Sequence, residues 1–183
     1  LVSKALQDKV FYKKSGGGVT LSGGEASFQA DFSVALMEAL KREGIHLALD
    51  TCGGVKWETL KRLVILADLV LYDLKLMDAD KHFDYTGIPL GLVLENAKKI
   101  AGYGKPMWVR TPIIPEYNDT EENTRLTARF IRDNLSRVER YDLLAFNNTC
   151  SSKYQRLGLS WDLEDKALIT EELMERLASV AQE

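Results

Sequence analysis

Five short apolar runs, rich in β-branched residues, recur along the chain. Each run is nearly continuous rather than alternating, which is typical of parallel strands buried on both faces. Each is also short enough for a strand and too short for a buried helix. The pattern predicts five parallel strands, at residues 18–22, 46–51, 67–74, 107–114 and 141–146.

Longer segments with helical periodicity separate these runs. A helix expected at 32–40 ends before Gly44, a residue suited to a C-terminal cap. Its apolar stripe consists of Phe32, Ala35, Leu36, Ala39 and Leu40. Similar stripes predict helices at 2–10, 57–64, 92–101 and from about Thr170.

One more helix start is indicated by a short polar pattern. Asp119 and Glu122 have the spacing of a capping pair, in which each side chain accepts a backbone hydrogen bond at the helix start. The helix that follows would carry Leu126, Phe130 and Ile131 on its apolar face. We therefore expect its N-cap at Asp119.

Strict alternation of strands and helices defines the fold class. It predicts an α/β domain over residues 1–183, with a parallel sheet and right-handed crossovers. An open doubly wound sheet and a full or partial barrel both fit this alternation. The order of elements alone does not distinguish them.

Polar or glycine-bearing clusters follow all five apolar runs. In parallel α/β folds the carboxyl ends of the strands form the working face, so we expect these clusters to meet there. The clusters are residues 22–25, residues 50–53, Asp73 with Lys75, Arg110, and Asn147 with Asn148.

Charged residues in these clusters indicate a buried polar site. Asp73 and Lys75 are two apart in a strand and should point to the same side, beside Asp50 of the neighbouring strand. Buried charges need partners, which favours a functional cluster over exposed pairs. Arg110 lies between apolar neighbours and could hold a carboxylate with two hydrogen bonds.

The glycines after the first run allow two interpretations. Gly23 and Gly24 are compatible with an ordinary turn. They would also let the backbone approach a ligand closely, with Glu25 free to pair with an ammonium group. His46 and His82 are not favoured as site residues, because one begins a strand and the other lies in a polar segment.

Composition excludes several classes of protein. The net charge of −3 shows no basic surface for nucleic acid, and no apolar run is long enough to cross a membrane. The first residues lack the apolar stretch of a signal peptide. Two cysteines, Cys52 and Cys150, make no disulfide framework, so a cytoplasmic location is expected.

Five segments together resemble a known family. They are SGGGVTLSGGEASFQADF, LDTCG, DLVLYDLK, VRTPIIPEYND and LLAFNNTCSSKYQRLG, in that order and spacing. The chain resembles the glycyl-radical activating enzymes of the radical S-adenosylmethionine (SAM) superfamily, and most of all the activators of pyruvate formate-lyase. The resemblance covers about residues 1 to 160.

This resemblance implies a fold and a reaction. The fold would be a partial β/α barrel of six strands, of which this chain has five and lacks the first. A reduced [4Fe-4S] cluster would cleave SAM, and the 5′-deoxyadenosyl radical would take a hydrogen atom from a glycine of a partner such as pyruvate formate-lyase. A flavodoxin or ferredoxin would supply the electron.

The resemblance also implies roles for individual residues. Gly23, Gly24 and Glu25 match the element that binds the methionyl amino group. Lys75 and Arg110 match residues that line the cofactor pocket. Asn147 is also matched to the cofactor pocket, where it could donate a hydrogen bond to a ribose or carboxylate. It stands where pyruvate formate-lyase activators commonly have His, which leaves the partner open. A possible monovalent cation would be held by Asp50, Thr51, Leu71 and Asp73, and Asp50 would also line the cofactor pocket.

The family's CxxxCxxC cluster element is not found in these residues, since Cys52 and Cys150 lie too far apart. Because the sequence begins with Leu, we expect a shortened sequence that is inactive alone. Loss of the first strand would leave an open edge at residues 18–22. We expect self-association there, or coverage by the N-terminal helix.

Two other functions remain open at this stage. The chain could be a module without a cluster that binds SAM or a partner protein. It could also be an aldolase-like barrel in which Lys75 forms a Schiff base.

Overall fold

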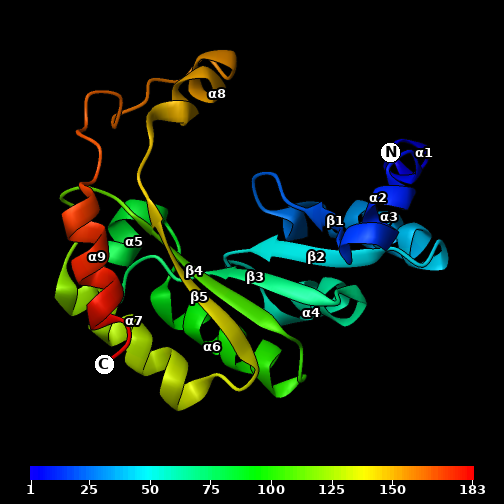
Figure 1. Cartoon of the computed structure of the whole chain (residues 1–183), viewed down its shortest axis with the longest axis horizontal. Helices are drawn as coiled ribbons and strands as arrows, with labels where there is room; N and C mark the ends of the chain where they lie inside the picture. Colours follow the sequence, from blue (N-terminus) through cyan, green and yellow to red (C-terminus); the bar gives the residue numbers. More distant parts are fainter.

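A computed structural model describes all 183 residues of the chain, Leu1–Glu183. Five parallel strands form one sheet in the order β1-β2-β3-β4-β5, so that each strand pairs with the next one along the chain. The sheet does not close into a full barrel (Figure 1). The strands are β1 (Gly18–Leu21), β2 (His46–Thr51), β3 (Leu69–Asp73), β4 (Met107–Ile113) and β5 (Val138–Ala145).

Helices connect successive strands, as the alternating pattern predicts. The helices before β4 are α1 (Val2–Leu6), α2 (Lys9–Ser15), the 3-10 turn η1 (Ala26–Gln29), α3 (Ala30–Arg42), α4 (Trp57–Leu66), α5 (Ala79–Thr86) and α6 (Leu90–Gly102). The later ones are α7 (Glu121–Asn134), the 3-10 turn η2 (Asn148–Cys150), α8 (Ser151–Arg156) and α9 (Glu171–Val180). Figure 1 shows α8 standing apart from the sheet. No helix has the length and apolar character needed to cross a membrane.

The hydrophobic core lies between one face of the sheet and helices α3, α4, α6 and α7. Leu47 and Leu49 of β2 and Tyr72 of β3 are fully buried in it. Burial of this apolar area is the main force that holds the helices on the sheet.

The opposite face of the sheet is only partly covered. Along β4, Met107, Val109 and Thr111 are fully buried, whereas Trp108 and Arg110, which alternate with them, are half-buried. The prediction that the strands are buried on both faces is therefore wrong for β3 and β4 and holds only in the middle of β2, where three successive residues are buried. In an open sheet that carries its helices on one side, apolar residues on the other side remain in contact with solvent.

The N-terminal prediction needs a similar correction. The helix expected at 2–10 is two short helices, α1 and α2, which are interrupted at Gln7 and Asp8. Leu1 lines a hollow beside β1, and Val2 and Leu6 pack against the core. β1 is an edge strand of the sheet, and the N-terminal residues lie next to it. Self-association through this edge stays a prediction.

The apolar stripe predicted for α3 is only partly correct: Leu40 is buried and Leu36 packs against the core, but the rest of the stripe is displaced. Phe32 is 55% exposed, whereas Ser33, Met37 and Leu40 are the residues that α3 buries. Met37 was overlooked because the continuous run of apolar residues from Val34 to Met37 fits more than one helical face.

The N-cap of α7 is Thr120 rather than Asp119. The hydroxyl of Thr120 accepts a hydrogen bond from the backbone N–H of Asn123 at 3.2 Å. Thr120 has the extended backbone that an N-cap requires. The helix start was therefore displaced by one residue in the sequence analysis.

This correction leads to a stability prediction. Thr120→Ala removes the acceptor of the cap and should lower the free energy of unfolding by about 1 kcal/mol. Asp119→Ala is the matched control and should change it by less than about 0.5 kcal/mol. Urea unfolding followed by circular dichroism measures both. An equal loss in the two variants would show that Thr120 is not the cap.

Candidate functional site

Arg110 lies at the centre of a charged cluster near the carboxyl ends of three neighbouring strands. Its Nη2 donates to Asp50 Oδ1 at 2.5 Å and to Asp73 Oδ1 at 2.7 Å, and its Nε donates to Asp73 at 3.1 Å. The parallel register sets Asp73 directly opposite Arg110 on the next strand. One guanidinium therefore joins β2, β3 and β4.

Two more residues extend this cluster. Lys75 Nζ lies 3.2 Å from Asp73 Oδ2, and the hydroxyl of Ser22 donates to Asp50 at 3.0 Å. The prediction that Asp73 and Lys75 point to the same side, beside Asp50, is confirmed. We call Ser22, Asp50, Asp73, Lys75 and Arg110 the charged cluster. Two carboxylates and two cations balance one another in it.

Partial burial strengthens the interactions of Arg110. Burial alone lowers the pKa of the guanidinium, but the charges and hydrogen bonds of Asp73 and Asp50 outweigh it. The pKa of Arg110 is therefore raised above its ordinary value. Its side chain is only 19% exposed, so solvent screens these pairs less than it screens surface ion pairs.

Glu25 lies apart from the charged cluster and accepts several hydrogen bonds. It accepts from the Thr51 hydroxyl at 2.9 Å, from the Cys52 backbone N–H at 3.1 Å and from the Ser27 hydroxyl at 2.6 Å. It also caps the turn η1 through the Ser27 N–H. The carboxylate is held in place by neutral groups, and no cation of the chain pairs with it within ion-pair distance.

The glycine loop before Glu25 is open to a ligand. Gly23 has φ of 139°, a conformation that residues with a side chain rarely adopt, and a Cβ at Gly23 or Gly24 would meet no atom within 4 Å. The loop therefore exposes its backbone beside a carboxylate that lacks a cation. An ammonium group fits this arrangement.

A side chain of α6 holds the loop after β2 in place by hydrogen bonds. Asn96 Nδ2 donates to the carbonyls of Gly53 at 2.7 Å and Val55 at 2.8 Å. A Cβ on Gly53 would lie 1.9 Å from the hydroxyl oxygen of Tyr72. Because Cys52 in the same loop donates to Glu25, Asn96 and Tyr72 help to position the carboxylate.

The remaining predicted site residues lie in different positions. Thr51 is buried against Glu25, and Leu71 pairs with Asp50 in the sheet register. Asn147 follows the end of β5, is exposed, and accepts from Thr149 in its own turn. No hydrogen bond joins Asn147 to the charged cluster or to Glu25.

Sequence reasoning overlooked two asparagines that shape the site. Asn118 Nδ2 donates to the carbonyl of Lys75 at 2.6 Å, and Asn123 Nδ2 reaches the same carbonyl at 3.3 Å. Both are buried, and Asn123 also accepts from the Met77 N–H. Nothing in the spacing of these asparagines marks them as buried, although Asn118 lies within the motif VRTPIIPEYND.

Burial alters the acid–base behaviour of two other side chains. Burial raises the pKa of the Cys52 thiol, with Glu25 adding to the effect and Lys75 opposing it. It also lowers the pKa of His82, with Lys75 acting in the same direction. His82 is only 3% exposed, although its polar surroundings in the sequence suggested a surface position.

Comparison with known proteins identifies the family. An incomplete parallel β/α barrel with a polar site at the carboxyl ends of its strands defines the class. The family model "Radical SAM superfamily" matches residues 4–128. The chain belongs to this superfamily, among the activating enzymes of glycyl-radical enzymes.

Several curated relatives carry the words "activating enzyme" in their names. The chain is 36% identical over 178 residues to the trans-4-hydroxy-L-proline dehydratase activating enzyme of Clostridioides difficile, covering 97% of this chain and 59% of the relative. It is 37% identical to the (2S)-3-sulfopropanediol sulfolyase activating enzyme of Bilophila wadsworthia, and the match covers 90% of this chain and 54% of the relative. It is 34% identical to the pyruvate formate-lyase-activating enzyme of Staphylococcus aureus, and that match covers 90% of this chain and 68% of the relative.

Solved structures support the same conclusion. A domain of pyruvate-formate lyase-activating enzyme from Bacteroides vulgatus superposes with a TM-score of 0.75 at 28% identity, covering 91% of this chain and 93% of that one. A radical SAM methyltransferase from Sphaerobacter thermophilus, at 14% identity and a TM-score of 0.70, shares the fold. The expected partial radical SAM barrel is confirmed. The chain spans between 54% and 68% of the length of the curated relatives above.

The packing of Gly53 on Tyr72 leads to a prediction. Gly53→Ala should cost about 3 kcal/mol in unfolding free energy, because it adds a methyl overlap to a backbone with φ of 67°. Gly87→Ala is the matched control, since Gly87 has φ of 69° and open space around it.

The control should lose only about 1 kcal/mol, the cost of the backbone conformation alone. Thermal or urea unfolding of both variants measures the difference. Equal losses would mean that the loop can move away from Tyr72, and the proposed support of Glu25 would then fail.

Proposed function

We propose that this chain is the SAM-binding part of an enzyme that activates a glycyl-radical enzyme. The proposal depends on one observation above all: within this superfamily, Arg110 and Glu25 form two distinct charged sites beside an open glycine loop. SAM carries an ammonium, a carboxylate and a sulfonium. A site for this amino acid needs both a carboxylate and a guanidinium.

Each group of the chain has a role in this proposal. Glu25 and the backbone of Gly23 and Gly24 bind the ammonium group of SAM. Arg110 binds its carboxylate with the charge-assisted hydrogen bonds that guanidinium favours. Lys75 and Asp50 line the pocket. Arg110 must loosen its contacts with Asp50 and Asp73 to bind a carboxylate, so these aspartates control how strongly it binds.

A monovalent cation at Asp50, Thr51, Leu71 and Asp73 is a further part of the proposal. The guanidinium of Arg110 now lies between the two carboxylates. A cation would therefore enter as Arg110 turns toward the bound carboxylate. No group of three or more His, Cys, Asp or Glu side chains suited to a metal ion is found in the structure.

The residues of this chain do not fit an iron–sulfur cluster. Cys52 is partly buried, Cys150 is exposed, and the chain has no third cysteine. We propose that the cluster ligands lie outside these 183 residues and that the residues alone do not cleave SAM. A cluster held by such ligands would supply the electron for reductive cleavage of SAM, and the reaction we propose for the whole protein is hydrogen abstraction from a glycine of the partner.

The partner enzyme is proposed at the level of its class. Relatives of similar identity are named for a dehydratase, a sulfolyase and pyruvate formate-lyase. Pyruvate formate-lyase is the first candidate, and Asn147 in place of His leaves the other two open. A flavodoxin or ferredoxin is the proposed reductant, and the cytoplasm is the proposed location.

The two other functions receive less support. A module without a cluster would use the same SAM site and differs from the proposed enzyme only in lacking the cluster. The aldolase-like function is disfavoured, because Schiff-base formation needs a free neutral lysine and Lys75 is ion-paired with Asp73 at 3.2 Å.

Direct binding tests the cofactor part of the proposal. The 183-residue chain should bind SAM in calorimetry, and Arg110→Ala should weaken binding by roughly tenfold or more through loss of charge-assisted hydrogen bonds. Arg132→Ala, on the exposed face of α7, is the matched control. Equal affinities for the two variants would remove Arg110 from the site.

Radical transfer tests the enzyme part. The longer protein that contains these residues should be reconstituted with iron and sulfide without oxygen, reduced, and mixed with SAM and a partner. Electron paramagnetic resonance should then detect a glycyl radical on one of the three candidate partners. A protein that forms no iron–sulfur chromophore would instead support the module without a cluster.

A further inference from the structure

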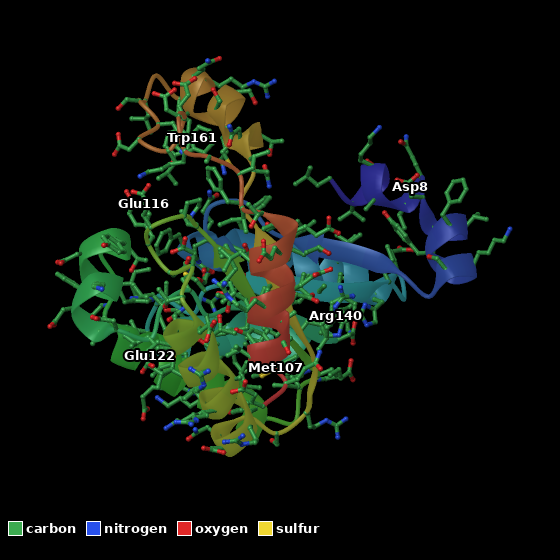
Figure 2. The ribbon with its side chains drawn as sticks, turned by 60° about the vertical axis from the view of Figure 1, so that its left-hand side comes forward. Asp8, Met107, Glu116, Glu122, Arg140 and Trp161 are labelled. Atoms are coloured by element: carbon green, nitrogen blue, oxygen red, sulfur yellow. The ribbon has the colours of Figure 1, made fainter.

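A hollow of about 580 Å³ lies beside the charged cluster and has no assigned role. Its walls come from α5, the loop after β4 and the segment that follows α8. Figure 2 shows Trp161 in that segment, beyond the loop that carries Glu116. Lys75 also lines the hollow, so the hollow adjoins the proposed SAM site.

His82 contributes a buried hydrogen-bond acceptor to this hollow. Its Nδ1 lies 2.8 Å from the carbonyl oxygen of Ile88, which can only accept, so Nδ1 carries the proton. Nε2 therefore presents a lone pair. His82 is only 3% exposed, and it lines the hollow.

No hydrogen bond within the chain reaches Nε2. Among the fully enclosed polar atoms of side chains, only Asn96 Oδ1 has no hydrogen-bond partner. Because Nε2 of His82 has no partner either, it is not fully enclosed, and it is accessible from the hollow. Burial also lowers the pKa of His82, which keeps the ring neutral and the lone pair free. A ligand in the hollow must therefore offer a hydrogen-bond donor to His82.

Aromatic rings form the walls of the hollow. Tyr85 and Tyr117 meet edge to face with ring centroids 4.8 Å apart. Tyr154 and Trp161 are stacked with centroids 5.9 Å apart. Such rings attract cations and planar groups. Lys166 lies 6.0 Å from the Tyr117 ring and is ion-paired with Glu116, so its charge is already neutralised.

The charges of the hollow favour a positive ligand. Lys75 is neutralised by its ion pair with Asp73. Asp84 and Asp162 also line the hollow, and neither forms an ion pair with a cation of the chain. A planar cation with several hydrogen-bond donors is the ligand that suits all three features: the two unpaired carboxylates, the aromatic walls and the buried acceptor.

We propose that this hollow binds the guanidinium of an arginine side chain from the partner polypeptide. The planar group would pack on the aromatic rings, donate to His82 Nε2 and pair with Asp84 and Asp162. The apolar lining formed by Leu76, Ile114 and Leu163 would contact the methylene stem. Guanidinium fits better than ammonium because it offers five donors and a flat face.

The origin of the arginine depends on the proposed function, whereas the hollow itself does not. If a partner presents its glycine to the SAM site, an arginine near that glycine would reach the hollow across Lys75. Binding of arginine can be measured on this chain without a cluster or radical. Failure here is therefore distinguishable from failure of the proposed activity.

Calorimetry with blocked amino acids tests the proposal. N-acetyl-arginine methylamide should bind at millimolar concentration, and its uncharged isostere N-acetyl-citrulline methylamide should bind at least tenfold more weakly. The double variant Asp84→Asn, Asp162→Asn should weaken arginine binding by roughly tenfold. Asp165→Asn, an exposed neighbour outside the hollow, is the matched control and should not change it.

His82→Leu provides a second test, with folding checked by thermal melting. It should lower the affinity for the arginine probe and leave SAM affinity unchanged. If His82→Leu does not fold, Trp161→Ala on the rim replaces it with the same expectation.

Three results would overturn the proposal. They are equal binding of the arginine and citrulline probes, tighter binding of N-acetyl-lysine methylamide than of the arginine probe, and no binding of the arginine probe at all.

Discussion

Sequential parallel pairing is the constraint on which the site depends. Each strand pairs with its successor in the chain, so Asp50 of β2, Asp73 of β3 and Arg110 of β4 lie side by side on one face of the sheet. The register aligns Asp73 with Arg110. A shift of one residue would turn Arg110 into the apolar core, where a charge without a partner is very costly. The same pairing therefore fixes both the fold and the charged cluster.

Much of this arrangement could be predicted from the sequence. β2 was predicted with its observed bounds, and α9 begins directly after Thr170, where the helix was expected to start. Asp73 and Lys75 lie together, as their spacing suggested, although β3 ends at Asp73 and Lys75 follows it. The predictions of β2 and α9 succeeded because the periodicity of a strand or helix is a local property of the sequence.

The errors concern features that depend on tertiary contacts. β5 starts at Val138, three residues before the predicted run, because Arg140 is charged and exposed while its backbone pairs with Trp108. Similarly, the sequence indicates that Arg110 holds a carboxylate, but not that two aspartates of the chain already occupy it. His82 was not favoured as a site residue because its neighbours are polar, whereas α5 turns that one side chain inward.

Asn96 makes positions far apart in the chain dependent on each other. Its amide nitrogen holds two carbonyls of the loop after β2, and this requires the loop backbone to come close to Tyr72, which only a glycine at position 53 allows. An aspartate at position 96 would direct an oxygen at those carbonyls and repel them. A side chain at position 53 would need a change at position 72 to make room for it, and would shift the loop carbonyls that Asn96 binds. We expect the three positions to vary together among the relatives of this chain, as one inherited unit.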